Sequence, residues 1–155
     1  MAYMQKYSFL IIFVLSAESI ISGMDQIWDP LRKKNVAATP EERVRQWFIS
    51  LLQGTMGVPV HMMKSEVGFR WGGKAYRADI LIWDRAGKPL AVVECKRPDV
   101  QLDAAVAEQA MRYNAVLDVR WIFLTNGGRT LLFRRSEDTF VPADSIPTYE
   151  QMTCE

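Results

Sequence analysis

Lys88-Pro-Leu-Ala-Val-Val-Glu-Cys-Lys96 is an apolar strand that ends on charged residues. The run from Leu90 to Val93 predicts a buried strand. Side chains two apart in a strand point to the same face, so Glu94 and Lys96 should lie side by side while Cys95 points the other way. Charges at the end of a buried strand are costly unless something binds to them. Glu94 and Lys96 are therefore the first candidates for a functional site.

The segments before this strand predict an antiparallel meander. Val60 to Trp71 contains an extended segment, in which His61 is given no role. Gly72-Gly73 is typical of a two-residue hairpin turn into a second strand, from Lys74 to Asp84. Arg85 to Pro89 is another turn, which leads back to the strand described above. These three strands should therefore be neighbours in one sheet.

A helix is expected to begin at Thr39-Pro-Glu-Glu42. Thr39 suits the N-cap, Pro40 suits the first helical position, and Glu42 completes a capping box. Helical spacing then continues in the apolar residues Val44, Trp47, Phe48, Leu51 and Leu52. Gly54 marks the end of the helix. One face of this helix should pack on the core.

The second half of the chain predicts a helix between two parallel strands. Helical spacing runs from about Leu102 to Leu117, between the strand that ends at Lys96 and a strand at Val119–Thr125. A last strand follows at Thr130–Phe133. A strand, a crossover helix and another strand imply one parallel pairing, so the sheet is mixed. The tail from Arg134 is expected to be irregular. The expected fold class is α/β (α+β), a central mixed β-sheet with an antiparallel meander, flanked by helices.

Length and composition indicate one domain. The chain has 155 residues, an apolar content of 49% and a charged content of 24%, which are the values of an ordinary globular protein. Its net charge of +1 means that any nucleic-acid binding must come from a local patch. Two cysteines, Cys95 and Cys154, do not make a disulfide framework, and a cytoplasmic location is expected.

The first 23 residues admit several interpretations. Lys6 and the apolar run Phe9–Leu15 have the shape of a short signal peptide, although the run is far shorter than the ~20 residues that span a membrane. The segment could equally be an edge strand from Tyr7 to Leu15, or an extension before a start at Met24. The expected organisation is an N-terminal extension (1–23), a domain (24–150) and a tail (151–155).

Asp79 interrupts the apolar second strand, and the hairpin brings it towards Glu94. Two converging carboxylates make an oxygen-rich site for a hard divalent cation such as Mg²⁺, which Mn²⁺ can replace. The ammonium of Lys96 can offset charge on a phosphate. The alternative is a cross-strand ion pair on a solvated sheet face. The surrounding apolar residues favour the functional interpretation, because charges there are disfavoured unless they are used.

Several other polar residues also have both a structural and a functional interpretation. Glu42 can cap its helix, act near the carboxylates, or do both. Gln109 and Tyr113 share one helix face, which indicates a polar cleft if Tyr113 is not simply core. Leu31-Arg-Lys-Lys34 is either a solvated loop or a phosphate contact. The segment Gly68 to Ala75 comes close to a phosphate-binding P-loop, but it lacks the Ser or Thr that holds magnesium and it predicts a hairpin.

Together these motifs resemble the PD-(D/E)XK nuclease superfamily. More closely, the chain from about residue 27 to about residue 149 is similar to the N-terminal nuclease domain of type I restriction enzyme R subunits, in a short stand-alone form. The residue before the first aspartate is Ala78 where the family motif has proline. The matching stretches are Ile27–Lys34, Thr39–Gln46, Arg77–Ile80, Lys88–Pro98 and Thr125–Gly127.

The resemblance implies a restriction-endonuclease-like fold and a set of site residues. Asp79, Glu94 and the backbone carbonyl of Cys95 would hold the metal, with Lys96 as the catalytic lysine. Glu42 would be a catalytic residue near the metal, through water. The residues expected to contact nucleic acid are Gln109, Tyr113, Arg112 and Arg77.

The resemblance also implies a function. The chain would be a metal-dependent endonuclease that hydrolyses DNA phosphodiester bonds, with DNA as its partner and no membrane. A motor or specificity subunit, or a second copy in a homodimer, could assemble with it, because the helicase motor of restriction enzymes is missing from these residues. The alternative is a non-catalytic nucleic-acid-binding module, or an accessory subunit, that keeps the nuclease fold.

Overall fold

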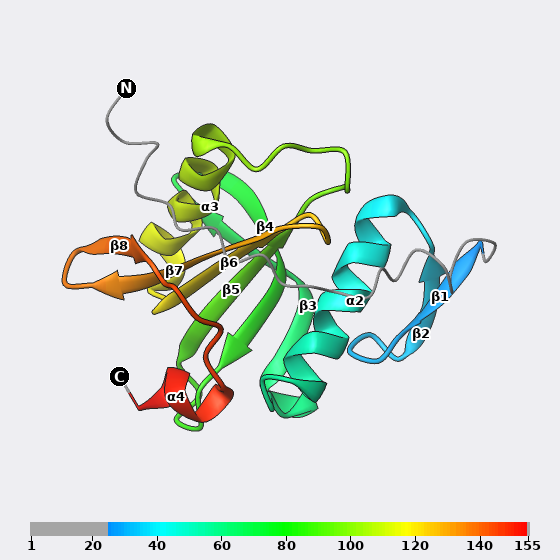
Figure 1. The fold of residues 1–155 in the computed structure, drawn as a ribbon, viewed down its shortest axis with the longest axis horizontal. Coiled ribbons are helices and arrows are strands. Elements are labelled where there is room, and N and C mark those ends of the chain that lie inside the picture. The colour runs from blue at the N-terminus through cyan, green and yellow to red at the C-terminus, as the bar shows by residue number, and fades with distance from the viewer. Residues whose placement is uncertain (1–24, 155) are drawn as a thin grey trace.

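A six-stranded sheet forms the centre of the computed structural model, which describes residues 25–154 (Figure 1). The strands lie in the order β3-β4-β5-β6-β7-β8. Only the pairing of β5 with β6 is parallel among these neighbours. Their bounds are Met63–Trp71, Lys74–Trp83, Pro89–Cys95, Trp121–Thr125, Thr130–Ser136 and Thr139–Pro142. The mixed sheet and its antiparallel meander are confirmed. The expected segment 1–23 lies outside the described residues.

The hairpin between β3 and β4 follows from its two glycines. Gly72 and Gly73 both have positive φ angles, 54° and 78°, which two-residue hairpin turns require and which glycine adopts without strain. The expected position of His61 on a strand is wrong. It lies in the short 3-10 helix η1 (Val60–Met62), and β3 begins only at Met63.

Helix α2 (Pro40–Gly54) begins as expected. The Thr39 hydroxyl accepts a hydrogen bond from the amide of Glu42, a cap of the kind that contributes about 1 kcal/mol. The reciprocal half of the predicted capping box is wrong. The amide of Thr39 donates to the carbonyl of Ala37, and the Glu42 carboxylate binds side chains described below.

Two apolar clusters lie on opposite faces of the sheet. The alternation of side chains along β4 sends Ile80 and Ile82 towards α2, and Leu81 towards α3 (Ala104–Leu117). Helix α3 joins the parallel strands β5 and β6, as predicted. Figure 1 shows α2 and α3 on either side of the central strands. The sheet is thus buried on both faces, which explains the nearly continuous apolar sequence of β5 and β6.

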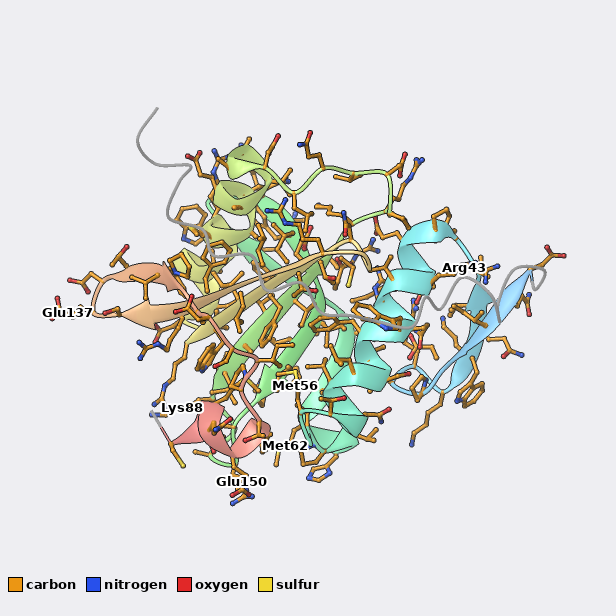
Figure 2. The ribbon with its side chains drawn as sticks, in the orientation of Figure 1. Arg43, Met56, Met62, Lys88, Glu137 and Glu150 are labelled. Atoms are coloured by element: carbon orange, nitrogen blue, oxygen red, sulfur yellow. The ribbon has the colours of Figure 1, made fainter. Side chains whose placement is uncertain are left out.

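The C-terminal tail is more ordered than expected. Strand β7 continues to Ser136, β8 pairs with it, and helix α4 (Tyr149–Thr153) follows. Met152 is fully buried, so the predicted tail 151–155 contributes to the core. The amide of Tyr149 donates to the carbonyl of Met56 at 2.7 Å, which fixes α4 beside the end of α2 (Figure 2). Short elements such as α4 carry too few apolar positions for periodicity to reveal them.

A second, two-stranded sheet lies beside α2. Strands β1 (Gln26–Asp29) and β2 (Lys34–Ala37) form a hairpin that sequence patterns did not predict. Figure 1 places this hairpin at the outer side of α2, away from the central sheet. No helix in the described part of the chain is both long and apolar enough to cross a membrane.

Candidate active site

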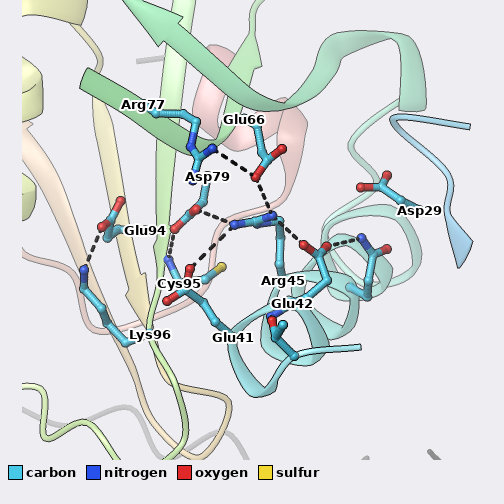
Figure 3. Close-up of polar contacts among 12 residues, drawn as sticks. Asp29, Glu41, Glu42, Arg45, Glu66, Arg77, Asp79, Glu94, Cys95 and Lys96 are labelled. Carbon is cyan, nitrogen blue, oxygen red and sulfur yellow. Dashed lines mark hydrogen bonds and ion pairs between the residues drawn. The ribbon is translucent and has the colours of Figure 1, made fainter. Parts of the chain in front are cut away.

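Asp79 and Glu94 lie on neighbouring strands, just beyond the last regular pair of β4 and β5. The last regular pairs include Ile80 with Val93, and the same register places Asp79 opposite Glu94. The amide of Cys95 donates to Asp79 Oδ2 at 2.7 Å. The Asp79 carboxylate therefore takes up a backbone donor at the point where the ladder ends (Figure 3).

Glu94 is a buried carboxylate with an incomplete set of partners. Burial, and then the charge of Asp79, raise the pKa of Glu94 to about 7, although Lys96 opposes this rise. Glu94 Oε1 accepts a hydrogen bond from Lys96 Nζ at 2.8 Å, so the predicted side-by-side arrangement is confirmed. Glu94 Oε2 is buried and has no hydrogen-bond partner among the described residues. Such an atom is uncommon in folded proteins and is a natural ligand for a cation.

Arg45 connects the first helix to this site. Its side chain is only 3% exposed, and Nη2 lies 2.7 Å from Asp79 Oδ1. Nη1 lies 2.7 Å from Glu42 Oε2 and 3.3 Å from Glu66 Oε1. Burial alone would lower the pKa of the Arg45 guanidinium, but the charges of Asp79 and Glu42 outweigh it and the pKa is raised. Glu42 is therefore linked to Asp79 through a guanidinium.

Sequence reasoning missed Arg45, although a signal for it was present. Arg45 follows Glu42 by three residues and precedes Phe48 by three, so it lies on the apolar face of α2. An arginine at such a position must find an acidic partner when the face is buried. The partner that matters here, Asp79, is 34 positions away in the chain and could not be identified by spacing.

Arg32 extends the ion pairs towards the β1–β2 hairpin. Its guanidinium binds Asp29, Glu42 at 2.6 Å and Glu66 at 2.8 Å. Asp29 is fully buried and also accepts from the amide of Leu31. Arg32 is therefore not a simply solvated residue, because it is part of a largely buried network, and a phosphate contact by the cluster at 31–34 stays a prediction. Since Arg32 contacts both α2 and β3, this network holds the small hairpin against the central domain.

The residues predicted to contact nucleic acid do not gather around the two carboxylates. Arg77 is 62% exposed, and its Nη1 lies 3.5 Å from Glu66 Oε1 at the edge of the network (Figure 3). Gln109 and Arg112 are exposed on α3. No hydrogen bond or ion pair between described residues joins Gln109 or Arg112 to Asp79 or Glu94. The backbone of Tyr113 is helical, and its side chain lies outside the described part of the structure.

The donor set at this site suits a hard divalent cation. Asp79 and Glu94 provide carboxylates, and the predicted third ligand is a backbone carbonyl, that of Cys95. The Cys95 thiol is not a ligand candidate, because burial raises its pKa and it packs in the core. Within residues 25–154, no three His, Cys, Asp or Glu side chains gather closely enough to hold a metal ion. Any cation here therefore depends on two carboxylates and the backbone.

Comparison with known proteins adds a family and a fold. A family model described as the type I restriction enzyme R protein N terminus (HSDR_N) matches residues 40–147. A solved fragment assigned to the HsdR subunit of a type I restriction enzyme from Vibrio vulnificus YJ016 is similar in fold, with a TM-score of 0.58 and 20% sequence identity. The match covers 75% of this chain and 25% of that chain, so this chain spans about a quarter of its relative's length. No curated protein matches the chain.

Proposed function

The chain belongs to the family of type I restriction enzyme R protein N-terminal domains, and from this we propose that it is a metal-dependent endonuclease acting on DNA phosphodiester bonds. The observation that carries the proposal is the pair of buried carboxylates on neighbouring strands, with Lys96 bound to Glu94 and one buried Glu94 oxygen lacking a partner among the described residues. An aspartate within one strand, and a glutamate and a lysine at the end of the next, are the groups expected in a PD-(D/E)XK nuclease.

Asp79, Glu94 and the backbone carbonyl of Cys95 would hold Mg²⁺ or Mn²⁺. When bound, the cation would offset charge on the scissile phosphate and lower the pKa of the attacking water. Glu94 must be ionised to act as a ligand, and its pKa of about 7 places this change near neutral pH. The environment of Glu94 would therefore determine the pH above which it can bind a cation.

Lys96 would act on the phosphate. Its side chain is about one fifth exposed, and its ammonium lies 2.8 Å from Glu94 Oε1, which holds it beside that carboxylate. Lys96 is the first residue after β5, and its amide donates to the carbonyl of Thr125 at 2.7 Å. This backbone bond to β6 fixes the position from which the side chain extends. A fixed ammonium is effective at stabilising charge that develops in a transition state.

Arg45 and Glu42 would position Asp79 and would not react themselves. The Arg45 guanidinium holds Asp79 Oδ1 while the Cys95 amide holds Oδ2, so the orientation of this carboxylate is set from two sides. Glu42 in turn holds Arg45. A rigid carboxylate favours one coordination geometry, as a catalytic metal site requires.

A second candidate function is supported by the same contacts. Both oxygens of Asp79 already have partners within the protein, and the Arg45 ion pair must be rearranged or shared if a cation is to bind. An arginine that neutralises the site would also lower its repulsion of a phosphate. This favours a non-catalytic DNA-binding module or an accessory subunit, which would assemble with a motor or specificity subunit or with a second copy of the chain.

A cleavage assay separates the two functions. Supercoiled plasmid and linear duplex would be incubated with the purified protein in Mg²⁺, in Mn²⁺ and in chelator. A nuclease should nick or cut in metal and be inactive in chelator, and Asp79→Asn should show neither nicking nor cutting. Binding without cleavage in both metals, with equal affinity for the wild type and Asp79→Asn, would support the accessory role instead.

A further inference from the structure

The β3–β4 hairpin presents two different faces beyond the site. Antiparallel pairing sets Phe69 against Tyr76 and Trp71 against Lys74, so these four residues share one face. The rings of Phe69 and Tyr76 stack at a centroid distance of 5.7 Å. Phe69 also packs with the apolar cluster beside α3. The base of the hairpin is thus anchored to the domain, while its tip extends beyond the core.

The opposite face of the hairpin is basic and leads to the site. Arg70 pairs with Ala75 and Arg77 pairs with Gly68, so two arginines alternate with two small residues. The Arg77–Glu66 ion pair brings Glu66 to this face, and Arg45 binds both Glu66 and Asp79, so the face leads to Asp79 through these contacts. The charge of Glu66 is offset by Arg32, Arg45 and Arg77. Between Glu66 and Asp79 the sequence contains no acidic residue. The charge of this face suits a chain of phosphates that ends at Asp79.

Trp71 stands at the tip of the hairpin, directly before the turn. It is 54% exposed, and a hairpin whose turn contains two glycines does not itself require an aromatic residue there. Exposed aromatic side chains beside basic residues are the platform on which unpaired bases stack in single-strand binding proteins. In a duplex the bases are already stacked, and such a side chain gains much less.

We propose that the β3–β4 hairpin is a binding arm for single-stranded DNA. Trp71, on one face of the hairpin tip, stacks on an unpaired base, and the strand then passes around the tip so that Arg70 and Arg77 on the opposite face contact its phosphates. This inference rests on the proposed function for the choice of DNA, and it adds a substrate class that the carboxylate site alone does not specify. The strand would run from the hairpin tip along the basic face towards Asp79.

Binding in chelator tests the hairpin independently of cleavage. The affinity of a fluorescein-labelled single strand, and of the duplex with the same sequence, would be measured by fluorescence anisotropy. Trp71→Ala should weaken single-strand binding roughly tenfold, the usual effect of losing one stacked base, and change duplex binding less than about twofold. Trp28→Ala is the matched control, since Trp28 is 57% exposed on the other hairpin, and it should change neither affinity.

Salt dependence tests the basic face. Arg70→Gln should reduce the slope of log affinity against log salt by about 0.7 on the single strand, the value expected for one lost phosphate contact. Arg85→Gln, at an arginine whose side chain is 70% exposed near α4, should leave the slope unchanged. Circular dichroism melting would show that each variant is folded.

The outcomes separate the two proposals. Equal loss on single strand and duplex for Trp71→Ala, or no loss on either, would overturn the hairpin proposal even if the protein cleaves DNA. Selective loss on the single strand would support it even if the protein never cleaves. An effect of Trp28→Ala as large as that of Trp71→Ala would also overturn it.

Discussion

Arg45 Nη2 lies 2.7 Å from Asp79 Oδ1, so a buried guanidinium binds the carboxylate that is expected to hold a metal. The same guanidinium binds Glu42 at 2.7 Å. Three ionised groups from α2 and β4 are therefore buried together, and each depends on the others for its charge to be tolerated. This relationship decides how the site should respond to substitution.

Arg45→Ala should destabilise the protein strongly. It leaves the Asp79 and Glu42 carboxylates buried without their shared partner, and the loss of one member of a buried ion pair costs about 3–5 kcal/mol. The free energy of unfolding from urea denaturation measures this. Arg85→Ala breaks the exposed ion pair with Glu150 and should cost less than about 1 kcal/mol. A loss for Arg45→Ala as small as that of the control would show that the buried network contributes little to stability.

Glu94→Gln should change how stability depends on pH. The folded pKa of Glu94 is about 7 and the ordinary value is 4.5, so between these pH values the folded state holds a proton that the unfolded state has lost. The free energy of unfolding therefore falls as pH rises from about 4.5 to about 7, by an amount on the order of a few kcal/mol from this group. Glu94→Gln removes this term and should be more stable than the wild type at pH 8 in chelator.

Urea denaturation at several pH values from 4 to 9 would measure the effect. Glu108→Gln, at an exposed position on α3, is the matched control and should follow the wild-type profile. If the wild type and Glu94→Gln show parallel profiles, Glu94 does not titrate in this range and the buried pair must be reinterpreted.

Lys96→Met should abolish cleavage with little loss of DNA binding. The ammonium that would stabilise charge on the phosphate is removed, while the basic face of the hairpin is unchanged. Removing a charge-stabilising group of this kind costs roughly a hundredfold to a thousandfold in rate. Single-turnover cleavage in Mg²⁺ gives the rate, and anisotropy in chelator gives the affinity. Lys88→Met, just before the other end of β5, should cleave at the wild-type rate. Wild-type cleavage by Lys96→Met would exclude Lys96 from the mechanism.

Much of the fold could be predicted because its strands follow simple rules. The apolar runs of β4, β5 and β6 are buried on both faces, and the Gly72-Gly73 turn selects the hairpin register. The pairing of Glu94 with Lys96 follows from strand alternation alone. The predicted N-cap at Thr39 is confirmed, because an N-cap depends only on residues that are close in the sequence.

The rest depended on contacts between distant segments. Arg45 and Arg32 read as a helix residue and a loop residue, and only the folded chain shows that they bind Asp79, Glu42 and Glu66. Helix α4 is only five residues long and is held by a backbone bond to Met56. Local spacing contains no information about such partners. Sequence reasoning thus found the acids and the lysine of the site but not the arginines that hold them.

Divalent cations should stabilise the wild type more at pH 8 than at pH 6. Protons compete with a cation for Glu94, whose pKa of about 7 means that the carboxylate is mostly ionised at pH 8 and mostly protonated at pH 6. A ligand that binds only the folded state raises the melting temperature in proportion to its occupancy. Melting curves with Mn²⁺ and with chelator should therefore separate at pH 8 and converge at pH 6. Asp79→Asn should show no separation at either pH, whereas Asp138→Asn, in the exposed β7–β8 turn, should behave as the wild type. A shift of equal size at both pH values, or one that Asp79→Asn retains, would place the cation at a site other than the Asp79–Glu94 pair.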